Sequence, residues 1–331
     1  MRFRPLLFLL LLAAAPCLRA QDFVFTPQWT AQAQFAGYYV ALKMGFYEQE
    51  GLHVRIEHPS ATRSALDRVR ENQSDATTLQ LAQALEILDH GIPLVNILQT
   101  SMSNGMVIVS RRGRDPLTLR GARVGTWASG FGQIAIAMSR RENLGYEWIP
   151  IGNNVNLFIA GAIDATLAMS YNEYYQILQA GIDVPPEAVY RFSDHGYNVQ
   201  EDGVYMTRAT YLKDPDRAER FARASRRGWE WAREHPEETL DIVMEMVRES
   251  HVGTNRVIQQ LMLDEVLRLQ CDRESSKPEF RLRPDMLSLA CALMLENGMI
   301  SREITYDELT GRGNIRSTSS VKGPAAPSRP G

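Results

Sequence analysis

The sequence has little cysteine and lacks the short motifs of common catalytic and metal centres. Only three cysteines occur in 331 residues, and the six histidines show no metal-ligand spacing. No G-x-S-x-G, H-E-x-x-H or C-x-x-C motif is present. These absences argue against a hydrolase nucleophile, a zinc centre and a dithiol redox site. We therefore predict a protein that is not an enzyme and has no catalytic residue, metal or cofactor.

Charge of either sign is not in large excess, and long apolar runs are missing from most of the chain. The formal net charge is −3 at pH 7, and such a mildly acidic balance gives no support for nucleic-acid binding. After the first 20 residues, no segment is apolar enough to predict a membrane span. We predict a soluble protein that acts as a monomer, without a nucleic-acid partner.

The first 20 residues have the pattern of a secretory signal peptide. Arg2 and Arg4 precede an apolar run at residues 6–15, which is too short to cross a bilayer. Cleavage is expected near Ala20, which places the mature protein in the periplasm or outside the cell. Cys17 could instead carry a lipid anchor, but the proline directly before it argues against that alternative.

The C-terminal region contains a predicted tail and two cysteines. Residues 311–331 are rich in glycine, proline, serine and arginine, and cannot bury enough surface to offset their ordering entropy. We predict a disordered tail there. Cys271 and Cys291 lie in amphipathic helical patterns and are expected to be small core residues. A disulfide between them is compatible with an oxidising compartment, and the sequence leaves it open.

Two segments of the sequence resemble each other and indicate the fold class. Residues 75–79 and 164–168 each predict a buried strand, followed by a helix that ends at Gly91 or Gly181. Strands that alternate with helices are typical of mainly parallel sheets covered on both faces. For a chain of this length we expect two α/β lobes. Four patterns of period 3.6 between residues 214 and 297 predict additional C-terminal helices.

Polar or aromatic residues follow most of the predicted strands. In parallel α/β sheets, ligands bind outside the carboxyl ends of the strands, so these residues are expected to line one cleft. The candidate ligand-binding residues are Trp29, Gln32, Tyr38, Gln80, Ser101, Trp127, Ser129, Phe131, Asn172 and Glu173. They offer stacking faces, side-chain amides, hydroxyls and a single carboxylate, which suits a flat, polar small molecule.

Individual roles follow from residue type and local sequence. Trp29 lies in a polar loop without apolar periodicity and is expected to stack on the ligand. Tyr38 opens a helix from which its ring could reach the cleft. The glycine-rich junction around Ser129 could hold an anion or a carbonyl oxygen with its backbone N–H groups. Asn172 and Glu173 have two open interpretations, a helix cap or a hydrogen-bonding partner of the ligand.

The segment that begins at Trp29 resembles the opening of a known protein family. The pattern consists of Gly37-Tyr38-Tyr39-Val40-Ala41-Leu42-Lys43, Gly45-Phe46-Tyr47 and Gly51-Leu52, followed later by Gly91-Ile92-Pro93, Gly121–Gly125 and Gly161–Ala165. The chain is thereby similar to the periplasmic substrate-binding proteins of the thiamine-pyrimidine and sulfonate group of ABC importers. That group includes nitrate- and taurine-like members and a domain like that of thiamine-pyrimidine synthase. The resemblance covers roughly residues 23–182.

The resemblance implies a two-lobed type II periplasmic binding protein fold, with each lobe a mainly parallel sheet flanked by helices. The first lobe would comprise residues 21–109 and 203–310, and the second lobe residues 110–202. The resemblance also implies capture of a small molecule for an ABC permease. The ligand would be a thiamine-precursor pyrimidine, a related heterocycle or a sulfonate.

Alternatives to an importer component stay open at this point. A sensor kinase could use the same domain as its periplasmic ligand detector. A pyrimidine-precursor synthase of thiamine biosynthesis is a third interpretation, but the cysteine-rich run of that enzyme is missing at residues 170–174. Gln32 and Gln34 stand where pyrimidine binders have an asparagine-rich loop. The sequence therefore does not name the ligand.

Overall fold

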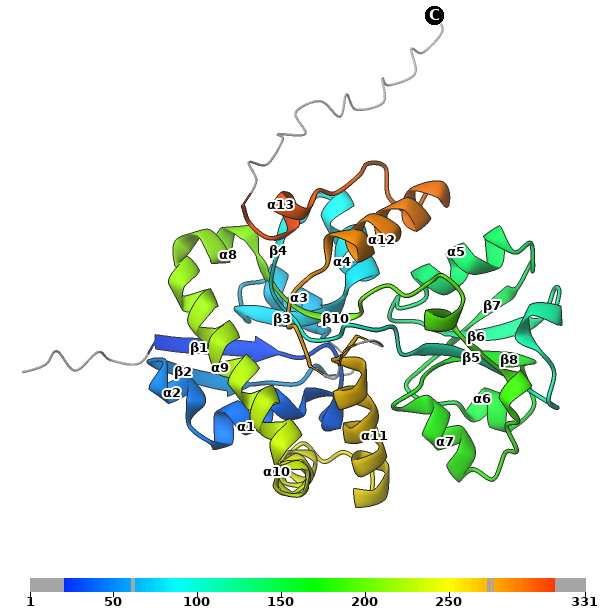
Figure 1. Ribbon diagram of the computed structural model, residues 1–331, viewed down its shortest axis with the longest axis horizontal. Coiled ribbons are helices and arrows are strands. Elements are labelled where there is room, and N and C mark those ends of the chain that lie inside the picture. The colour runs from blue at the N-terminus through cyan, green and yellow to red at the C-terminus, as the bar shows by residue number, and fades with distance from the viewer. Residues whose placement is uncertain (1–20, 61–62, 273–274, 276, 313–331) are drawn as a thin grey trace, which may run out of the picture.

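The computed structural model describes residues 21–60, 63–272, 275 and 277–312. The predicted signal peptide with Cys17, and the predicted tail from residue 313 onwards, lie outside the described residues. The described part of the chain forms two lobes, each built on one five-stranded sheet (Figure 1). None of the helices in these residues is both long and apolar enough to span a membrane.

The first lobe contains a sheet in the order β2-β1-β3-β10-β4. Its strands are β1 (Gln21–Thr26), β2 (Leu52–Ile56), β3 (Ala76–Gln80), β4 (Leu94–Gln99) and β10 (Asp202–Thr207). Helices α1 (Ala36–Lys43), α2 (Phe46–Gln49), α3 (Ala65–Arg70) and α4 (Leu81–Asp89) follow the first strands along the chain. The central strand β3 is buried along its whole length, as expected of a strand covered on both faces.

The second lobe repeats this plan with the strand order β7-β6-β8-β5-β9. Its strands are β5 (Met106–Ser110), β6 (Arg123–Trp127), β7 (Glu147–Ile151), β8 (Ala165–Met169) and β9 (Val189–Arg191). Its helices are α5 (Gln133–Arg141), α6 (Asn156–Ile159) and α7 (Glu173–Gln179). The repeat seen in the sequence corresponds to β3–α4 and β8–α7. Gly91 and Gly181, just after these helices, have φ angles of 88° and 77°, which favour glycine.

One strand of each sheet runs against the others. β10 is antiparallel to β3 and β4, and β5 is antiparallel to β8 and β9, whereas the remaining pairs are parallel. Both antiparallel strands come directly after the chain crosses between the lobes, at residues 100–105 and 192–201. The mainly parallel sheets predicted from the sequence are confirmed, with one antiparallel strand in each.

The sequence analysis placed the end of the first lobe at Val109, but the structure places it before β5, which starts at Met106. Because β5 pairs with β8 and β9, its residues belong to the second sheet. The return to the first sheet begins at Asp202, where β10 starts. A buried strand has the same apolar pattern in either sheet, so its pairing partners decide where it belongs and the local sequence does not.

Helices from the C-terminal third complete the first lobe. They are α8 (Arg208–Lys213), α9 (Pro215–Glu234), α10 (Pro236–Glu249), α11 (Arg256–Leu269), α12 (Pro284–Glu296) and α13 (Tyr306–Leu309). Local chemistry sets the start of α9, where the Asp214 carboxylate accepts from the Arg217 N–H at 3.0 Å and Pro215 occupies the first turn. In Figure 1, α11 lies next to the second lobe. The Ser170 hydroxyl of that lobe donates to Glu265 of α11 at 2.6 Å.

The two cysteines in the described residues form no disulfide with each other. Cys291 is buried on α12, and its thiol lies 3.6 Å from the Ile304 carbonyl oxygen. Burial raises the pKa of this thiol, as expected for a core cysteine. Cys271 is half-buried just after α11.

Helices α1 and α9 cross in contact at two glycines. A Cβ atom on Gly37 would lie 2.2 Å from the Trp229 ring, and one on Gly228 would lie 2.0 Å from the Gly37 carbonyl oxygen. Any side chain at either position would therefore force the helices apart. Their close approach places Tyr38 between Phe25 and Trp229, with ring centroids 4.7 and 5.7 Å away. The packing of α1 against α9 in the first lobe therefore requires a glycine at position 37.

We predict that Gly228→Ala lowers the free energy of unfolding by about 1–3 kcal/mol or more, because it overpacks this crossing. Gly253→Ala is the matched control, since a Cβ there would meet no atom within 4 Å. Urea unfolding followed by tryptophan fluorescence measures both variants. Equal unfolding midpoints for the two would contradict the close contact between α1 and α9.

Candidate ligand-binding site

The two lobes face each other across a cleft at the carboxyl ends of β1, β3, β6 and β8. Aromatic and amide side chains bound this space, as they commonly do in small-molecule sites. Its lining residues are Gln28, Trp29, Gln32, Gln34 and Gln80 from the first lobe, and Trp127, Phe131, Met169, Tyr171, Asn172 and Glu173 from the second. A ligand in this space would therefore touch both lobes.

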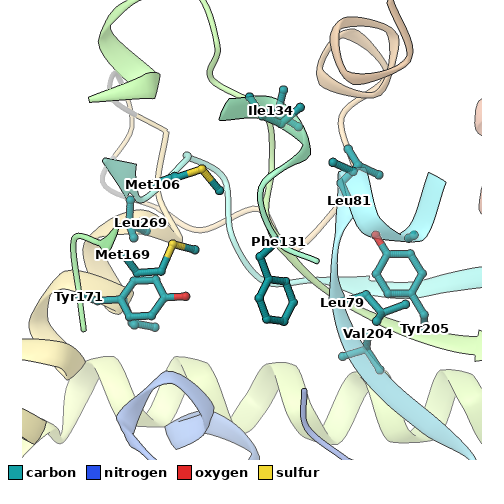
Figure 2. Close-up of a cluster of buried hydrophobic side chains, with 14 of the residues drawn as sticks. Leu79, Leu81, Met106, Phe131, Ile134, Met169, Tyr171, Val204, Tyr205 and Leu269 are labelled. Carbon is teal, nitrogen blue, oxygen red and sulfur yellow. The ribbon is translucent and has the colours of Figure 1, made fainter. Parts of the chain in front are cut away.

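Aromatic side chains from both lobes form the walls of the cleft. The Trp29 and Phe131 ring centroids are 5.9 Å apart at 65°, and the Phe131 and Trp127 centroids are 6.3 Å apart at 77°. Such edge-to-face geometry is favourable for aromatic pairs. Figure 2 shows Phe131 projecting between Tyr171 on one side and Leu79 on the other. Because Trp29 is only half-buried, part of its ring is available to a ligand.

The loop that carries Trp29 is held from behind by His58. The Nδ1 atom of His58 lies 2.6 Å from the Trp29 carbonyl oxygen, and its Nε2 atom lies 2.9 Å from the Tyr39 hydroxyl. A carbonyl oxygen only accepts, so Nδ1 carries the proton and Nε2 accepts from Tyr39. Burial lowers the pKa of His58, which favours the neutral ring that this arrangement requires.

A chain of side-chain amides leads from the cleft to Asp202. Gln32 Nε2 donates to Gln34 Oε1 at 2.6 Å, and Gln34 Nε2 donates to one Asp202 oxygen at 2.6 Å. Gln28 Nε2 donates to the other Asp202 oxygen at 2.8 Å. In the described part of the chain, the buried Gln28 Oε1 atom has no protein partner. The carboxylate thus orients the side-chain amides of Gln28 and Gln34.

Glu173 is the carboxylate that the sequence analysis placed in the cleft, and it is 2% exposed. It accepts hydrogen bonds from Trp127 Nε1 at 3.2 Å, from the Met169 N–H at 3.0 Å and from the Asn172 amide at 3.1 Å. Burial raises the pKa of Glu173, and these donors act against that rise. The contacts hold Trp127 in place, whereas the Asn172 side chain makes no capping hydrogen bond to the backbone of α7.

Negative charge and neutral amides surround the cleft, without a basic side chain. None of its described lining residues is Lys, Arg or His. Burial raises the pKa of Asp202 to about 6 and, with a smaller effect of the Asp202 charge, raises the pKa of the adjacent Glu201 to about 8. Across the described residues, no group of three or more His, Cys, Asp or Glu side chains could hold a metal ion.

Most of the residues predicted from the sequence come together in this cleft. Seven of them line it, namely Trp29, Gln32, Gln80, Trp127, Phe131, Asn172 and Glu173. Their contact with a ligand stays a prediction. The strand-end rule brought them together because the carboxyl ends of parallel strands meet at one edge of each sheet.

The other three predicted residues do not reach the cleft. Tyr38 is 1% exposed, because α1 turns its side chain into the core against Trp229. Ser129 is exposed outside the cleft lining. Ser101 lines a smaller chamber behind the cleft, where its hydroxyl accepts from the Glu201 N–H at 2.7 Å.

Several site residues were not among the sequence candidates. Gln28, Gln34, Met169 and Tyr171 belong to the same strand ends and loops as predicted residues, so the strand-end rule could have included them. Asp202 is different, because it stands at the beginning of β10 and pairs in register with Gln80 at the end of β3. An antiparallel strand brings its first residue to the edge where parallel strands end.

Two α/β lobes that enclose a cleft lined from both sides define the periplasmic binding protein class of folds. A family model described as NMT1/THI5 like matches residues 32–239, which is more than half of the chain. The chain belongs to the NMT1/THI5-like family. The resemblance found in the sequence is thereby confirmed.

Similar proteins of known activity include two binding proteins. The chain is 23% identical over 229 residues to a formylaminopyrimidine-binding protein of Halalkalibacterium halodurans. This alignment covers 65% of this chain and 68% of that protein. The chain is also 21% identical over 275 residues to the riboflavin-binding protein RibY of Chloroflexus aurantiacus. This alignment covers 75% of this chain and 74% of that protein.

Solved structures share the fold at low sequence identity. The periplasmic aliphatic sulphonate binding protein SsuA from Escherichia coli matches with a TM-score of 0.62 and 13% identity, over 94% of this chain and 97% of that chain. The desulfurization enzyme DSZB matches with a TM-score of 0.57 and 14% identity, over 87% of this chain and 96% of that chain. At such identities the likeness concerns the fold alone.

We predict a pH-dependent difference in stability between the native protein and Glu201→Gln. The pKa of Glu201 is raised from 4.5 to about 8, so its stabilising contribution is complete below about pH 4.5 and is lost as the pH rises through about 8. The variant should melt near the native temperature at about pH 5 and several degrees higher at about pH 9, since 1 kcal/mol shifts Tm by roughly 2–4 °C in a chain of this size. A difference that stays constant between these pH values would contradict the prediction.

Proposed function

We propose that this protein captures a flat, polar heterocycle in the cleft and delivers it to an ABC permease. The observation that carries the proposal is the composition of the cleft, where Trp29, Phe131 and Trp127 line the same space as several side-chain amides. Aromatic faces stack on a flat ring, and glutamine and asparagine side chains can donate to or accept from its polar edge. Nothing in this lining pairs a nucleophile with a base.

The charges around the cleft favour a neutral or cationic ring over a sulfonate. A buried sulfonate would lie near the carboxyl groups of Glu173 and Asp202 without a basic partner, which is energetically costly. The two similar binding proteins are named for formylaminopyrimidine and riboflavin, which both contain nitrogen heterocycles. We infer a pyrimidine or a related nitrogen heterocycle as the ligand, with a role in supplying thiamine precursors.

The proposed location is the periplasm, after removal of the N-terminal segment near Ala20. There the permease would recognise the form in which the ligand joins the two lobes. The lobes already meet beside the cleft, where Gln133 donates to Glu86 at 2.7 Å and Ser170 donates to Glu265 at 2.6 Å. A ligand that touches both lobes would add to these contacts, so binding would favour the joined arrangement.

We predict that pyrimidines or flavins raise the melting temperature of the purified protein and that alkanesulfonates do not. At a ligand concentration of about 100 times Kd, binding adds roughly 2.7 kcal/mol to the stability of the folded state, which a thermal-shift panel detects. Stabilisation by sulfonates alone would overturn the proposed ligand class.

We predict that Trp29→Ala weakens binding of the stabilising compound at least about tenfold, because stacking on an aromatic side chain contributes roughly 1–3 kcal/mol. Trp148→Ala is the matched control, because Trp148 is half-buried on β7 outside the cleft lining and packs on Tyr146. Isothermal titration calorimetry measures both variants. Native affinity in Trp29→Ala would show that the ligand binds elsewhere.

A further inference from the structure

The loop at residues 27–32, which we call the stacking loop, joins β1 to the next helical turn and forms no helix or strand of its own. Side chains therefore hold its backbone in place. Thr78 accepts from a backbone N–H near the start of the loop at 2.9 Å, and Gln259 accepts from one just after its end at 2.7 Å. Between these two points, His58 holds the carbonyl group of Trp29.

His58 does not line the cleft, yet it is connected to two residues that do. Its Nδ1 atom donates to the Trp29 carbonyl oxygen at 2.6 Å, and its Nε2 atom accepts from the Tyr39 hydroxyl at 2.9 Å. The backbone of Gln32 also forms a hydrogen bond with Tyr39. One imidazole and one phenol thus hold the backbone of both Trp29 and Gln32.

Packing keeps the imidazole of His58 in this orientation. The ring centroid of Phe35 lies 5.8 Å from that of His58, and the centroid of Tyr39 lies 5.9 Å away. Phe35 and Tyr39 are themselves 0% exposed. Turning the imidazole over would give up both of its hydrogen bonds between these two buried side chains. The position of the stacking loop therefore depends on one tautomer of one ring.

Protonation of His58 is incompatible with this pair of hydrogen bonds. The neutral ring carries a proton on Nδ1 for the Trp29 carbonyl and a lone pair on Nε2 for the Tyr39 hydroxyl. An imidazolium ring carries a proton on both nitrogen atoms, so Nε2 no longer accepts. The Tyr39 hydroxyl then loses its acceptor in a buried place, which is energetically costly.

The charged groups around His58 do not compensate for a positive charge on it. Glu57, the residue before it, is paired with Arg68 of α3 and with Arg55 of β2. Tyr39 is the titratable group that faces the ring from α1, and burial raises its pKa. Across the described residues, no carboxylate forms an ion pair with His58. Burial accordingly lowers the pKa of His58, so the ring takes up a proton more readily once it has moved into water.

We propose that His58 is a positioning residue for the ligand, whose neutral ring holds the stacking loop and whose protonation weakens ligand capture. This inference rests on the proposed function, because Trp29 must be the residue on which the ligand stacks. It goes beyond that function by adding control by pH through a residue that touches no ligand.

The first test measures Kd by isothermal titration calorimetry at about pH 7.5 and about pH 5.5. The probes are riboflavin and formylaminopyrimidine, for which the two similar proteins are named. Only the neutral ring supports the bound loop, so affinity is complete above the ordinary histidine pKa of about 6.5 and falls as the pH falls below it. Kd should rise about threefold to tenfold, because the competent fraction is about one tenth at one pH unit below that value.

Two matched variants assign the acid effect to His58. His58→Asn keeps an amide N–H for the Trp29 carbonyl but cannot be protonated. His53→Asn is the control, because His53 is exposed on β2 beside Asp22, at 2.9 Å. The ratio of Kd at pH 5.5 to Kd at pH 7.5 should be about threefold to tenfold larger in the native protein and in His53→Asn than in His58→Asn. Asp202, whose pKa of about 6 lies in the same range, is present in all three proteins and cancels from this comparison.

A measurement on the native protein covers the case in which His58→Asn does not fold. Proton–nitrogen correlation spectra of the histidine rings report the tautomer and the pKa of each ring. His58 should carry its proton on Nδ1 at pH 7.5, and its pKa should be lower with saturating riboflavin or formylaminopyrimidine than without. The opposite tautomer, or equal pKa values with and without the probe, would overturn the proposal.

The outcomes separate this inference from the function on which it rests. If the probes bind and His58→Asn shows the same ratio of Kd values as the native protein, the role of His58 is wrong while heterocycle capture stands. If neither probe binds the native protein at pH 7.5, the proposed function fails, and the role of His58 in it fails as well.

Discussion

The structure depends on how the chain re-enters each sheet after crossing between the lobes. Both crossings end in an antiparallel strand, β5 or β10, whose first residue lies at the cleft edge where the parallel strands end. Glu201 and Asp202 stand at the second of these points. The Glu201 carboxylate accepts from Gly105 of the other crossing, while Asp202 orients Gln28 and Gln34 in the cleft. The connection between the lobes and the ligand site therefore share neighbouring residues.

This arrangement places the connection between the lobes beside the cleft. Asp202 bonds to two glutamines of the cleft lining, and the adjacent Glu201 bonds to the other crossing. The contacts between the lobes include the Gln133–Glu86 and Ser170–Glu265 hydrogen bonds and the Trp29–Phe131 ring pair. One hydrophobic core cluster contains buried residues of both lobes, so apolar packing joins the lobes as well.

The elements of the fold were largely predictable because their signals are local. The apolar period of 3.6 placed α9 to α12 to within a few residues, and the strand-turn-helix repeat indicated the doubled α/β plan. The roles within the Gly37-Tyr38-Tyr39 pattern were not predictable in this way. Gly37 permits the contact with α9, Tyr38 packs in the core, and Tyr39 supports His58 behind the Trp29 loop. Adjacent residues on a helix point in different directions, and only their neighbours decide which of them reaches the cleft.

The sequence by itself determined the fold class and most of the chemistry of the cleft, because parallel strands deliver their following residues to a common edge. Only the tertiary structure decided that Asp202 anchors the glutamines and that Ser101, Glu201 and Gln270 lie near one another behind the cleft. These residues are brought together by antiparallel strand pairing and by the position of α11. Some of them are about 170 residues apart in the sequence. Contacts at such separation leave no periodic pattern in the sequence, since they are set by which strand lies beside which.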